Sequence, residues 1–426
     1  ETRGTIWSVR LGRDRNALEC SDNVLASEPG NTKALMAKAD LYEKLEEWED
    51  LIGTLERAGD VGAVVLSDDE VKAIYSRQAI VLDQKLNRPF DAIESWQKVL
   101  RVDPEDRTGL EALRELFHRQ QMWEEYIGIL GRLVPLSDPQ TQISLYEEIA
   151  TSWIERVGLA SNATDPYAAI LKIQPDNEDA FIKLEKLYRE TDNTASLIQL
   201  YLDKYEVERD KKRRSELLLK TARLYEESMG DEDSSFLLIQ KAYLEDYGDA
   251  RVIEEVERIT AKTGKWEELI GVVNSKLAEL GNRIEAVPLY LQVGKWYGER
   301  LGHLQYATAI YGKVLQMDPS NVGALSAIAD LYKAAGQWDN YVHYLKMQIE
   351  KARSDDVRRE ILVKLGKTYD EELNRIDDAM ETFRRVIEID PLNRDALDAL
   401  DEIYRGKEMY RELIDVLKKK IQSLGP

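Results

Sequence analysis

The sequence contains little cysteine, histidine or proline, and it has no long hydrophobic run. Its single cysteine, Cys20, excludes an internal disulfide framework. The three histidines, His118, His303 and His343, stand far from one another and from Cys20, so no motif with metal-ligand spacing is present. Because nowhere do about 18 apolar residues follow one another, we expect no segment that inserts into a membrane.

Positive charge is also in short supply. The chain has 59 Lys and Arg residues against 80 Asp and Glu residues, a net charge of −21. Phosphate binding needs clustered basic side chains, so this balance argues against a nucleic-acid partner. Charged residues make up 33% and hydrophobic residues 43% of the 426 positions, which is typical of soluble helical proteins with amphipathic faces. We therefore expect a soluble protein and favour the cytoplasm, although these features do not determine the compartment.

Motifs that carry chemistry are missing as well. The sequence has no Gly-rich phosphate loop, no H-E-x-x-H or G-x-S-x-G motif and no EF-hand loop. Carboxylate runs, such as residues 43–47, are not accompanied by a histidine, a nucleophile or a metal-binding glycine turn. Such runs are typical of solvated helix faces. We predict that the protein is not an enzyme and that it binds no metal and no cofactor.

What the sequence does contain is a long internal repeat. Short turns that include a proline recur along the chain, and these prolines lie 75, 71, 144 and 72 residues apart. The interval of 144 spans two periods of 72, with a degenerate copy of the turn at residues 246–249 between them. So regular a period over the whole chain indicates a solenoid. The prolines are Pro29, Pro104, Pro175, Pro319 and Pro391.

Other landmark residues keep a constant distance from each turn. An aromatic residue lies 19 positions after five of the six turns, and Thr194 is the exception. A small residue lies 12 positions before each turn, where it allows two helices to cross closely. We interpret the recurring aromatic residues as core side chains and Cys20 as a small buried residue. The aromatic positions are Trp48, Trp123, Trp266, Trp338 and Tyr410; the small positions are Ala17, Ala92, Ala163, Ser235, Ala307 and Ala379.

Apolar residues between the landmarks follow helical spacing, which predicts four helices in each 72-residue double repeat, or two hairpins of about 36 residues. Asn321 and Asn393, which follow turn prolines, are candidates to cap the next helix. Trp7 has the same position within its repeat as Tyr369, so the sequence begins inside a repeat, and it has no initiator methionine. We therefore expect a fragment of a longer protein. We expect a single solenoid over residues 1–426: a half-unit at 1–28, double repeats at 29–103, 104–174, 175–246, 247–318 and 319–390, and a half-unit at 391–426.

The second hairpin of a double repeat resembles the tetratricopeptide repeat (TPR) family, whose pattern is W-x-x-L-G-x-x-Y followed by Ala, Phe and Pro. The half-a-TPR repeats of RNA-processing scaffolds are the rival interpretation, and the recurring Ala and Pro phases favour TPR. The resemblance implies an all-α fold, a right-handed superhelical solenoid of antiparallel helix hairpins with about 12 TPR-like repeats. It rests on Leu365, Gly366, Tyr369, Ala379, Phe383 and Pro391, and on a second copy at Gly294, Tyr297, Ala307, Tyr311 and Pro319.

Three features depart from a regular array. The first complete double repeat is three residues longer than the period of 72, and the excess near residues 57–65 is either a tolerated loop extension or a binding loop. The copy at residues 246–265 has lost its proline, which indicates either drift compensated by neighbouring repeats or a softer joint. The second hairpin of each double repeat also carries one residue more than the family pattern, between Tyr369 and Ala379.

The resemblance implies a binding face as well. The family binds partners on its concave face, which the first helix of each hairpin lines, and the clamp for a C-terminal carboxylate is not recognisable here. Opposite charges three positions apart, such as Asp330 and Lys333, are candidates either for partner binding or for pairing along their own helix. The predicted binding residues are Asp40, Glu43, Glu115, His118, Lys186, Arg189, Arg223, Lys295, Asp330, Lys333, Lys367, Asp370, Glu402 and Arg405, and the same face includes Asp83 and Glu226.

Two functions fit these observations. The first is a non-catalytic scaffold that binds partner proteins or peptides along a concave charged groove, through shape and charge complementarity over a preformed surface. The alternative is a structural spacer or self-assembling rod segment of a large multidomain protein, with self-association as its signature. The partner and the pathway are not identifiable from the sequence.

Overall fold

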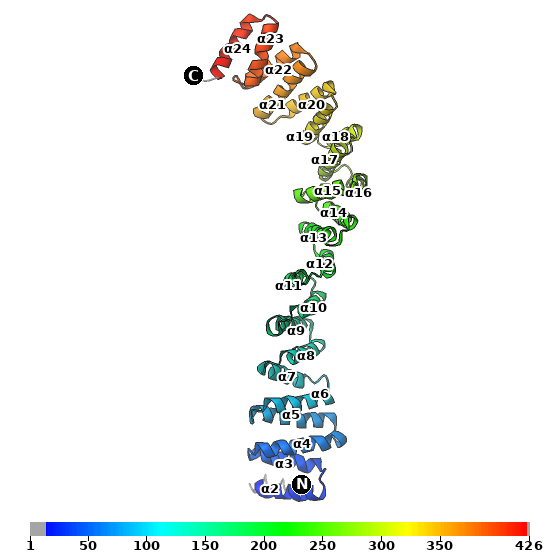
Figure 1. Ribbon diagram of the computed structural model, residues 1–426, viewed down its shortest axis with the longest axis vertical. Coiled ribbons are helices and arrows are strands. Elements are labelled where there is room, and N and C mark those ends of the chain that lie inside the picture. The colour runs from blue at the N-terminus through cyan, green and yellow to red at the C-terminus, as the bar shows by residue number, and fades with distance from the viewer. Residues whose placement is uncertain (1–13, 424–426) are drawn as a thin grey trace. The chain divides into compact units, whose positions relative to one another are not determined.

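The computed structural model describes residues 14–423, and within this range it contains α-helices, short 3₁₀ and π segments and no β-strand (Figure 1). The chain forms two compact units, Glu1–Val207 and Glu208–Pro426, called the N-terminal unit and the C-terminal unit below. The predicted all-α repeat fold is confirmed, whereas the right-handed sense of the solenoid stays a prediction.

Helices follow one another with short connections in both units. The helices of the N-terminal unit are α2 (Asp14–Ser27), α3 (Thr32–Lys44), α4 (Trp48–Val65), α5 (Asp68–Gln84), α6 (Pro89–Val102), α7 (Arg107–Arg119), α8 (Trp123–Leu133), α9 (Pro139–Ser152), α10 (Thr164–Ile173), α11 (Glu178–Glu190) and α12 (Thr194–Val207). Those of the C-terminal unit are α13 (Lys211–Met229), α14 (Glu232–Glu245), α15 (Ala250–Thr263), α16 (Trp266–Leu280), α17 (Val287–Lys295), α18 (Leu304–Met317), α19 (Val322–Ala334), α20 (Trp338–Lys351), α21 (Asp355–Lys367), α22 (Ile376–Ile389), α23 (Arg394–Gly406) and α24 (Tyr410–Ser423).

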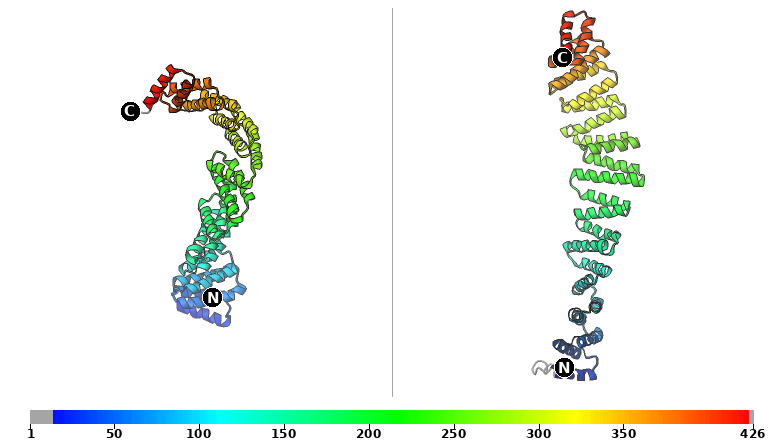
Figure 2. Two further views of the ribbon diagram at one scale, coloured as in Figure 1. Left: turned by 45° about the horizontal axis from the view of Figure 1, so that its top comes forward. Right: turned by 60° about the vertical axis from the view of Figure 1, so that its left-hand side comes forward.

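Consecutive helices pack as hairpins, from α3/α4 to α23/α24, and the hairpins stack on one another within each unit (Figure 2). Helix α2 takes the place of the second helix of the first hairpin. Gly4 and Trp7, which the repeat pattern assigns to the first helix of that hairpin, lie outside the described residues. The predicted boundaries at residues 28, 103, 174, 246, 318 and 390 all fall between helices, although the division into one continuous solenoid stays a prediction.

Each recurring turn precedes the first helix of a double repeat, and the last residue of the turn caps that helix. The side chains of Asn321 and Asn393 each accept a hydrogen bond from the backbone N–H three residues later, at 3.0 and 3.1 Å. The degenerate copy keeps this cap: Asp249 accepts from the N–H of Arg251 at 2.8 Å, and α15 and α16 are ordinary helices. Loss of its proline is therefore compensated locally.

The small landmark residues lie where two helices cross. Ala17, Ala92, Ala163, Ser235, Ala307 and Ala379 are all fully buried. The family glycines have the same role: a Cβ at Gly366 would come within 2.7 Å of the ring of Phe383, and one at Gly294 within 2.7 Å of the ring of Tyr311. The recurring small residues and glycines therefore indicate close packing of the helices.

The extra residue of the second hairpins is accommodated by widening the last turn of the first helix. The π segments Trp153–Val157, Trp296–Arg300 and Thr368–Glu372 follow α9, α17 and α21 directly. A π turn takes up one residue more than an α turn over the same rise, which matches the insertion between Tyr369 and Ala379. At the end of α13, the N–H of Gly230 reaches the carbonyl of Tyr225 in a turn of the same width.

Two sequence-based expectations are wrong. The excess residues near 57–65 form no loop; they extend α4 to Val65, which leaves Val64 and Val65 exposed. Cys20 is partly exposed and not buried.

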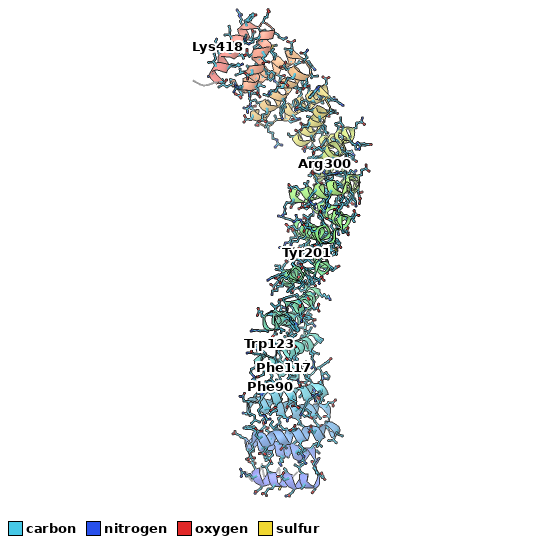
Figure 3. The ribbon with its side chains drawn as sticks, in the orientation of Figure 1. Phe90, Phe117, Trp123, Tyr201, Arg300 and Lys418 are labelled. Atoms are coloured by element: carbon cyan, nitrogen blue, oxygen red, sulfur yellow. The ribbon has the colours of Figure 1, made fainter. Side chains whose placement is uncertain are left out.

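The recurring tryptophans are also less buried than the expected core side chains, because they lie at the edge between successive hairpins. A basic side chain of the next hairpin covers three of these four rings: Lys85 lies 5.3 Å from Trp48, Arg156 5.2 Å from Trp123 and Arg300 5.6 Å from Trp266 (Trp123 and Arg300 are labelled in Figure 3).

Among residues 14–423, no helix combines the length and the apolar character needed to cross a bilayer.

Candidate functional site

The predicted binding residues lie on the first helices of the hairpins, which are α3, α5, α7, α9 and α11 in the N-terminal unit and α13, α15, α17, α19, α21 and α23 in the C-terminal unit. We call their exposed side the first-helix face. Several charged side chains on it contact the first helix of a neighbouring hairpin, whereas others pair along their own helix or make no ion pair among the described residues.

In the N-terminal unit, arginines bind carboxylates of the preceding hairpin. Arg77 of α5 donates to Asp40 of α3 at 2.7 Å and also to Glu43. Arg119 of α7 donates in the same way to Asp83 of α5. Asp40, Glu43 and Asp83, all assigned to the binding face from the sequence, are thus already engaged in ion pairs between hairpins.

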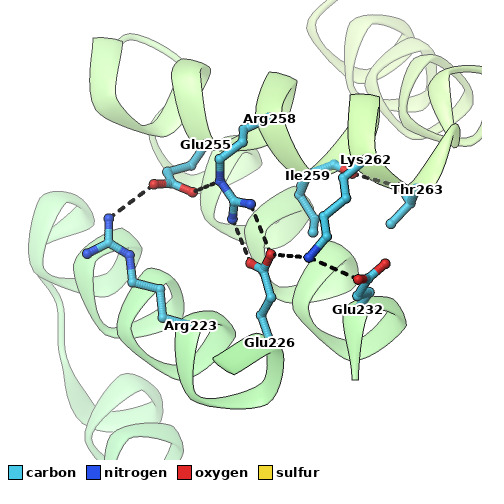
Figure 4. Close-up of polar contacts among 8 residues, drawn as sticks. All are labelled: Arg223, Glu226, Glu232, Glu255, Arg258, Ile259, Lys262 and Thr263. Carbon is cyan, nitrogen blue, oxygen red and sulfur yellow. Dashed lines mark hydrogen bonds and ion pairs between the residues drawn. The ribbon is translucent and has the colours of Figure 1, made fainter. Parts of the chain in front are cut away.

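In the C-terminal unit, α13 and α15 are joined by a larger network (Figure 4). Glu226 accepts two hydrogen bonds from Arg258, at 3.0 and 2.7 Å, and one from Lys262 at 2.8 Å. The hydrogen bonds from Arg258 lower the pKa of Glu226 to about 2, although burial opposes the shift. Arg223 of α13 reaches Glu255 of α15 at 3.1 Å. The network holds charges of both signs in fixed places.

A hollow of about 440 Å³ lies between α13 and α15 beside this network. Arg223 is 59% exposed in its wall and is the only predicted binding residue among the residues that line the hollow. Arg251, also exposed, pairs with Glu216 across it at 3.4 Å and with Asp249 at 2.9 Å. The lining residues are Ser215, Glu216, Leu219, Lys220, Arg223, Asp249, Arg251, Val252, Glu254 and Glu255.

Glu257 of α15 connects to the following hairpin. It accepts from Lys295 at 3.0 Å, from the indole Nε1 of the buried Trp296 at 3.1 Å and from Arg300 at 3.3 Å. Burial raises the pKa of Glu257, but the hydrogen bonds from these donors outweigh burial, so the pKa is lowered overall. A weaker link of the same kind joins Lys367 of α21 to Asp395 of α23 at 3.3 Å.

Other predicted residues bind within their own hairpin. Arg189 donates to Glu185 at 3.1 Å and to the hydroxyl of Tyr201 at 2.6 Å. Lys186 lies 3.7 Å from Glu190. The exposed His118 makes an edge contact with the ring of Trp123 and a tilted contact with the ring of Tyr126, at centroid distances of 5.4 and 5.3 Å.

Asp330 with Lys333 and Glu402 with Arg405, which the sequence leaves as candidates for pairing along a helix, form no ion pair with each other. Arg405 donates to Asp401 at 2.6 Å instead of to Glu402. Lys333 lies 6.0 Å above the ring of Tyr341 instead of beside Asp330. In the part of the chain that the structure describes, Glu115, Asp330 and Glu402 are exposed and make no ion pair.

Asp370 and Glu402 are brought near each other by the stacking of successive hairpins. Partial burial raises the pKa of Asp370, and the charges of Glu371 and Glu402 raise it further. These acidic side chains and Asp330 form the less neutralised part of the first-helix face.

Sequence reasoning missed the partners that hold the face together, notably Arg77, Glu255, Glu257 and Arg258. One signal was available: the opposite charges that pair between hairpins on this face lie 28 to 43 residues apart, about one hairpin length, as in Lys367–Asp395 and Arg300–Glu257. No cluster of metal-ligand side chains occurs among residues 14–423.

Comparison with known proteins supports the repeat assignment. Models of the tetratricopeptide repeat match residues 34–61 and 360–391. The first range covers most of α3 and α4, and the second covers most of α21 and all of α22. No curated protein matches the chain. The chain is TPR-like, as its residue pattern predicts.

Similar solved structures include Naa15/Naa10 bound to HypK-THB, at 14% identity, covering 99% of this chain and 62% of that chain with a TM-score of 0.31. A structure of MamA is 21% identical, covers 38% of this chain and 91% of its own, and has a TM-score of 0.29. The human IFIT1 dimer with m7Gppp-AAAA is 12% identical, covers 88% of this chain and 94% of its own, and has a TM-score of 0.29. This chain therefore spans less than two thirds of the first of these structures.

Proposed function

We propose that the protein is a non-catalytic scaffold that binds partner proteins or peptides along the first-helix face. This proposal rests on the hollow between α13 and α15, because ion pairs between these two helices hold exposed charges of both signs around it. A partner that binds there does not have to order these side chains, so little conformational entropy is lost on binding. The TPR matches support the same role.

The electrostatics favour a protein partner over a nucleic acid. The chain has a net charge of −21, and arginines such as Arg77, Arg223 and Arg258 are neutralised by neighbouring carboxylates. Phosphate binding requires a row of unpaired basic side chains, and the paired arginines of the first-helix face do not provide one. Basic side chains of a partner fit the acidic positions Asp330 and Glu402.

The proposal is tested on the full chain with a partner that it captures and that is then purified for direct binding measurements. D330R and E402R reverse exposed charges that make no ion pair in residues 14–423, so both variants keep their fold. We expect each to weaken binding about tenfold. The control E388R changes an exposed residue on the second helix α22 and leaves binding unchanged. Equal affinities for all three variants would contradict partner binding at the acidic positions Asp330 and Glu402 of the first-helix face.

The alternative role as a structural spacer is favoured by a separate observation, the ion pairs that link hairpin to hairpin, such as Arg77–Asp40 and Lys295–Glu257. Sedimentation velocity over a range of protein concentrations distinguishes the two roles. Self-association of the chain without any partner supports the spacer, and a monomer that binds its partner one to one supports the scaffold.

A further inference from the structure

A second hollow, of about 220 Å³, opens between the second helices α10 and α12 of the N-terminal unit. Unlike the hollow between α13 and α15, it is mainly apolar. Its volume is below the few hundred Å³ usual for drug-sized ligands, so it suits a single large side chain. We call it the α10–α12 groove; its lining residues are Ala168, Leu171, Lys172, Pro175, Phe181, Leu184, Tyr188, Ser196, Gln199, Leu200, Asp203 and Lys204.

The groove is open because one residue differs from the equivalent residue of the earlier repeats. In the two preceding double repeats, an arginine 28 positions after the turn proline donates to the carbonyl of that proline: Arg57 to Pro29 at 3.0 Å, and Arg132 to Pro104 at 2.5 Å. Each of these side chains crosses from the second helix to the turn. At the same phase the third double repeat has Asp203, which has no proton to donate to the carbonyl of Pro175. Pro175 is left in the wall of the groove.

The charges at the rim are not equivalent. Lys204 is engaged, because its Nζ lies 2.7 Å from Glu178 and 5.4 Å from the centre of the Phe181 ring. Asp203 accepts a hydrogen bond from Gln199 at 2.7 Å. Lys172, on the opposite wall, is exposed and makes no ion pair within the described part of the chain. The groove therefore combines an apolar interior with one available cation at its edge.

We infer that the α10–α12 groove is a docking site for an amphipathic segment of a partner protein, which places one large apolar side chain between the two helices and an acidic side chain against Lys172. The apolar walls provide the affinity, because the inserted side chain and groove residues such as Leu171 and Tyr188 leave water together. Lys172 provides the orientation, because it pairs with a carboxylate only when the segment lies in one direction.

This inference goes beyond the proposed function and does not rest on it. The groove is formed mainly by second helices, whereas the scaffold proposal concerns the first-helix face and its residues Arg223, Asp330 and Glu402. Failure of the first-helix variants to change binding leaves the groove proposal intact, and the reverse is equally true.

The test uses the immobilised full chain and a phage-displayed library of random 12-residue peptides. We expect the selected peptides to pair a large apolar residue with a nearby Asp or Glu. A synthetic selected peptide is then titrated against variants by fluorescence anisotropy. D203R restores the arginine of the earlier repeats and closes the groove, so it keeps the fold and weakens binding at least about tenfold. K172E reverses the free charge and weakens binding about fivefold or more.

The matched control is S275R, which places an arginine at the same phase of the next double repeat, beside the hollow between α14 and α16. It leaves the peptide affinity unchanged. The inference is overturned if D203R binds as the unmodified chain does, or if the selected peptides are basic or lack a large apolar residue. It is also overturned if the chain self-associates and D203R abolishes that association, because the occupant is then a second copy.

Discussion

Protonation of Glu226 is expected to weaken the C-terminal unit in acid. This carboxylate is only 12% exposed, and three hydrogen bonds from Arg258 and Lys262 favour its charged form. Its pKa falls from 4.5 to about 2, which corresponds to about 3 kcal/mol of folding free energy. Arg258 and Lys262 are 43% and 44% exposed, so solvent screening reduces the expected contribution to about 1–2 kcal/mol.

The direction of the pH effect follows from the lowered pKa. Well above pH 4.5, at about pH 6, the carboxylate is ionised in both the folded and the unfolded chain, and the full stabilisation is present. As the pH falls from 4.5 toward 2, the unfolded chain takes up a proton that the folded chain does not, so the stabilisation is lost progressively. At about pH 3 more than half of it is gone.

The variant E226Q isolates this effect because it removes the charge and keeps the shape. Urea unfolding of the full chain is followed by tryptophan fluorescence, since Trp266 begins α16, the helix after α15, and Trp296 donates to Glu257 of α15. We expect E226Q to lose about 1–2 kcal/mol at pH 6, and more than half of that difference to disappear at pH 3. The control E232Q alters a 44% exposed carboxylate that also contacts Lys262, and it costs at most about 0.5 kcal/mol. A loss in E226Q that is as large at pH 3 as at pH 6, or no loss at pH 6, would refute the reasoning.

Three further substitutions probe the other contacts that hold the hairpins together. G366A forces a methyl group against the Phe383 ring, so we expect it to destabilise the protein by about 1–3 kcal/mol in thermal unfolding. The control is G312A inside α18, where a new methyl group meets nothing within 4 Å. We expect G312A to be neutral or to stabilise the protein by up to about 1 kcal/mol. W296F removes the indole donor to Glu257 and should cost about 1–3 kcal/mol in urea unfolding; an unchanged midpoint would show that Glu257 is satisfied by its other donors. R77A leaves Asp40 and Glu43 without their shared cation and should cost about 1 kcal/mol at low salt, with a smaller cost in 1 M salt; an equal cost at both salt concentrations would argue for lost packing instead of lost charge.

The regular parts of the fold were predictable from the sequence because each landmark has one dominant physical cause. Proline ends a helix, the asparagine after it caps the next, and a small residue marks a helix crossing, as Pro319, Asn321 and Ala307 illustrate. The extra residue before Ala379 was also visible, but its accommodation as a π turn was not, because an insertion of one residue fits a longer loop equally well. For the same reason the excess near residues 57–65 was placed in a loop although it extends α4.

The charged face was predicted only as a set of positions, because pairing depends on how hairpins stack. Spacing within a helix suggested Glu402 with Arg405, yet Arg405 binds Asp401, and Lys333 lies over Tyr341. Exposed side chains at neighbouring helical positions compete at similar energies, of a few tenths of a kcal/mol (roughly 0.2–0.5), so sequence spacing does not select among them. Contacts between hairpins decide instead, and they join residues about one hairpin length apart, as in Arg223–Glu255, which are 32 positions apart.

The positions most informative about function are therefore those where a repeat departs from its sisters without losing its fold. Arg57 and Arg132, which share one phase in the first two complete double repeats, each close the space between the second helix and the turn. Asp203 does not close this space, so the apolar walls of the groove stay exposed to water. The N-terminal unit therefore lacks the stability that an arginine at this position would add. This loss of stability is useful to a scaffold only if a partner side chain buries the same apolar walls when it binds. On this argument, D203R should stabilise the N-terminal unit while it removes binding, and a D203R chain that is both less stable and unable to bind would show that Asp203 has a purely structural role.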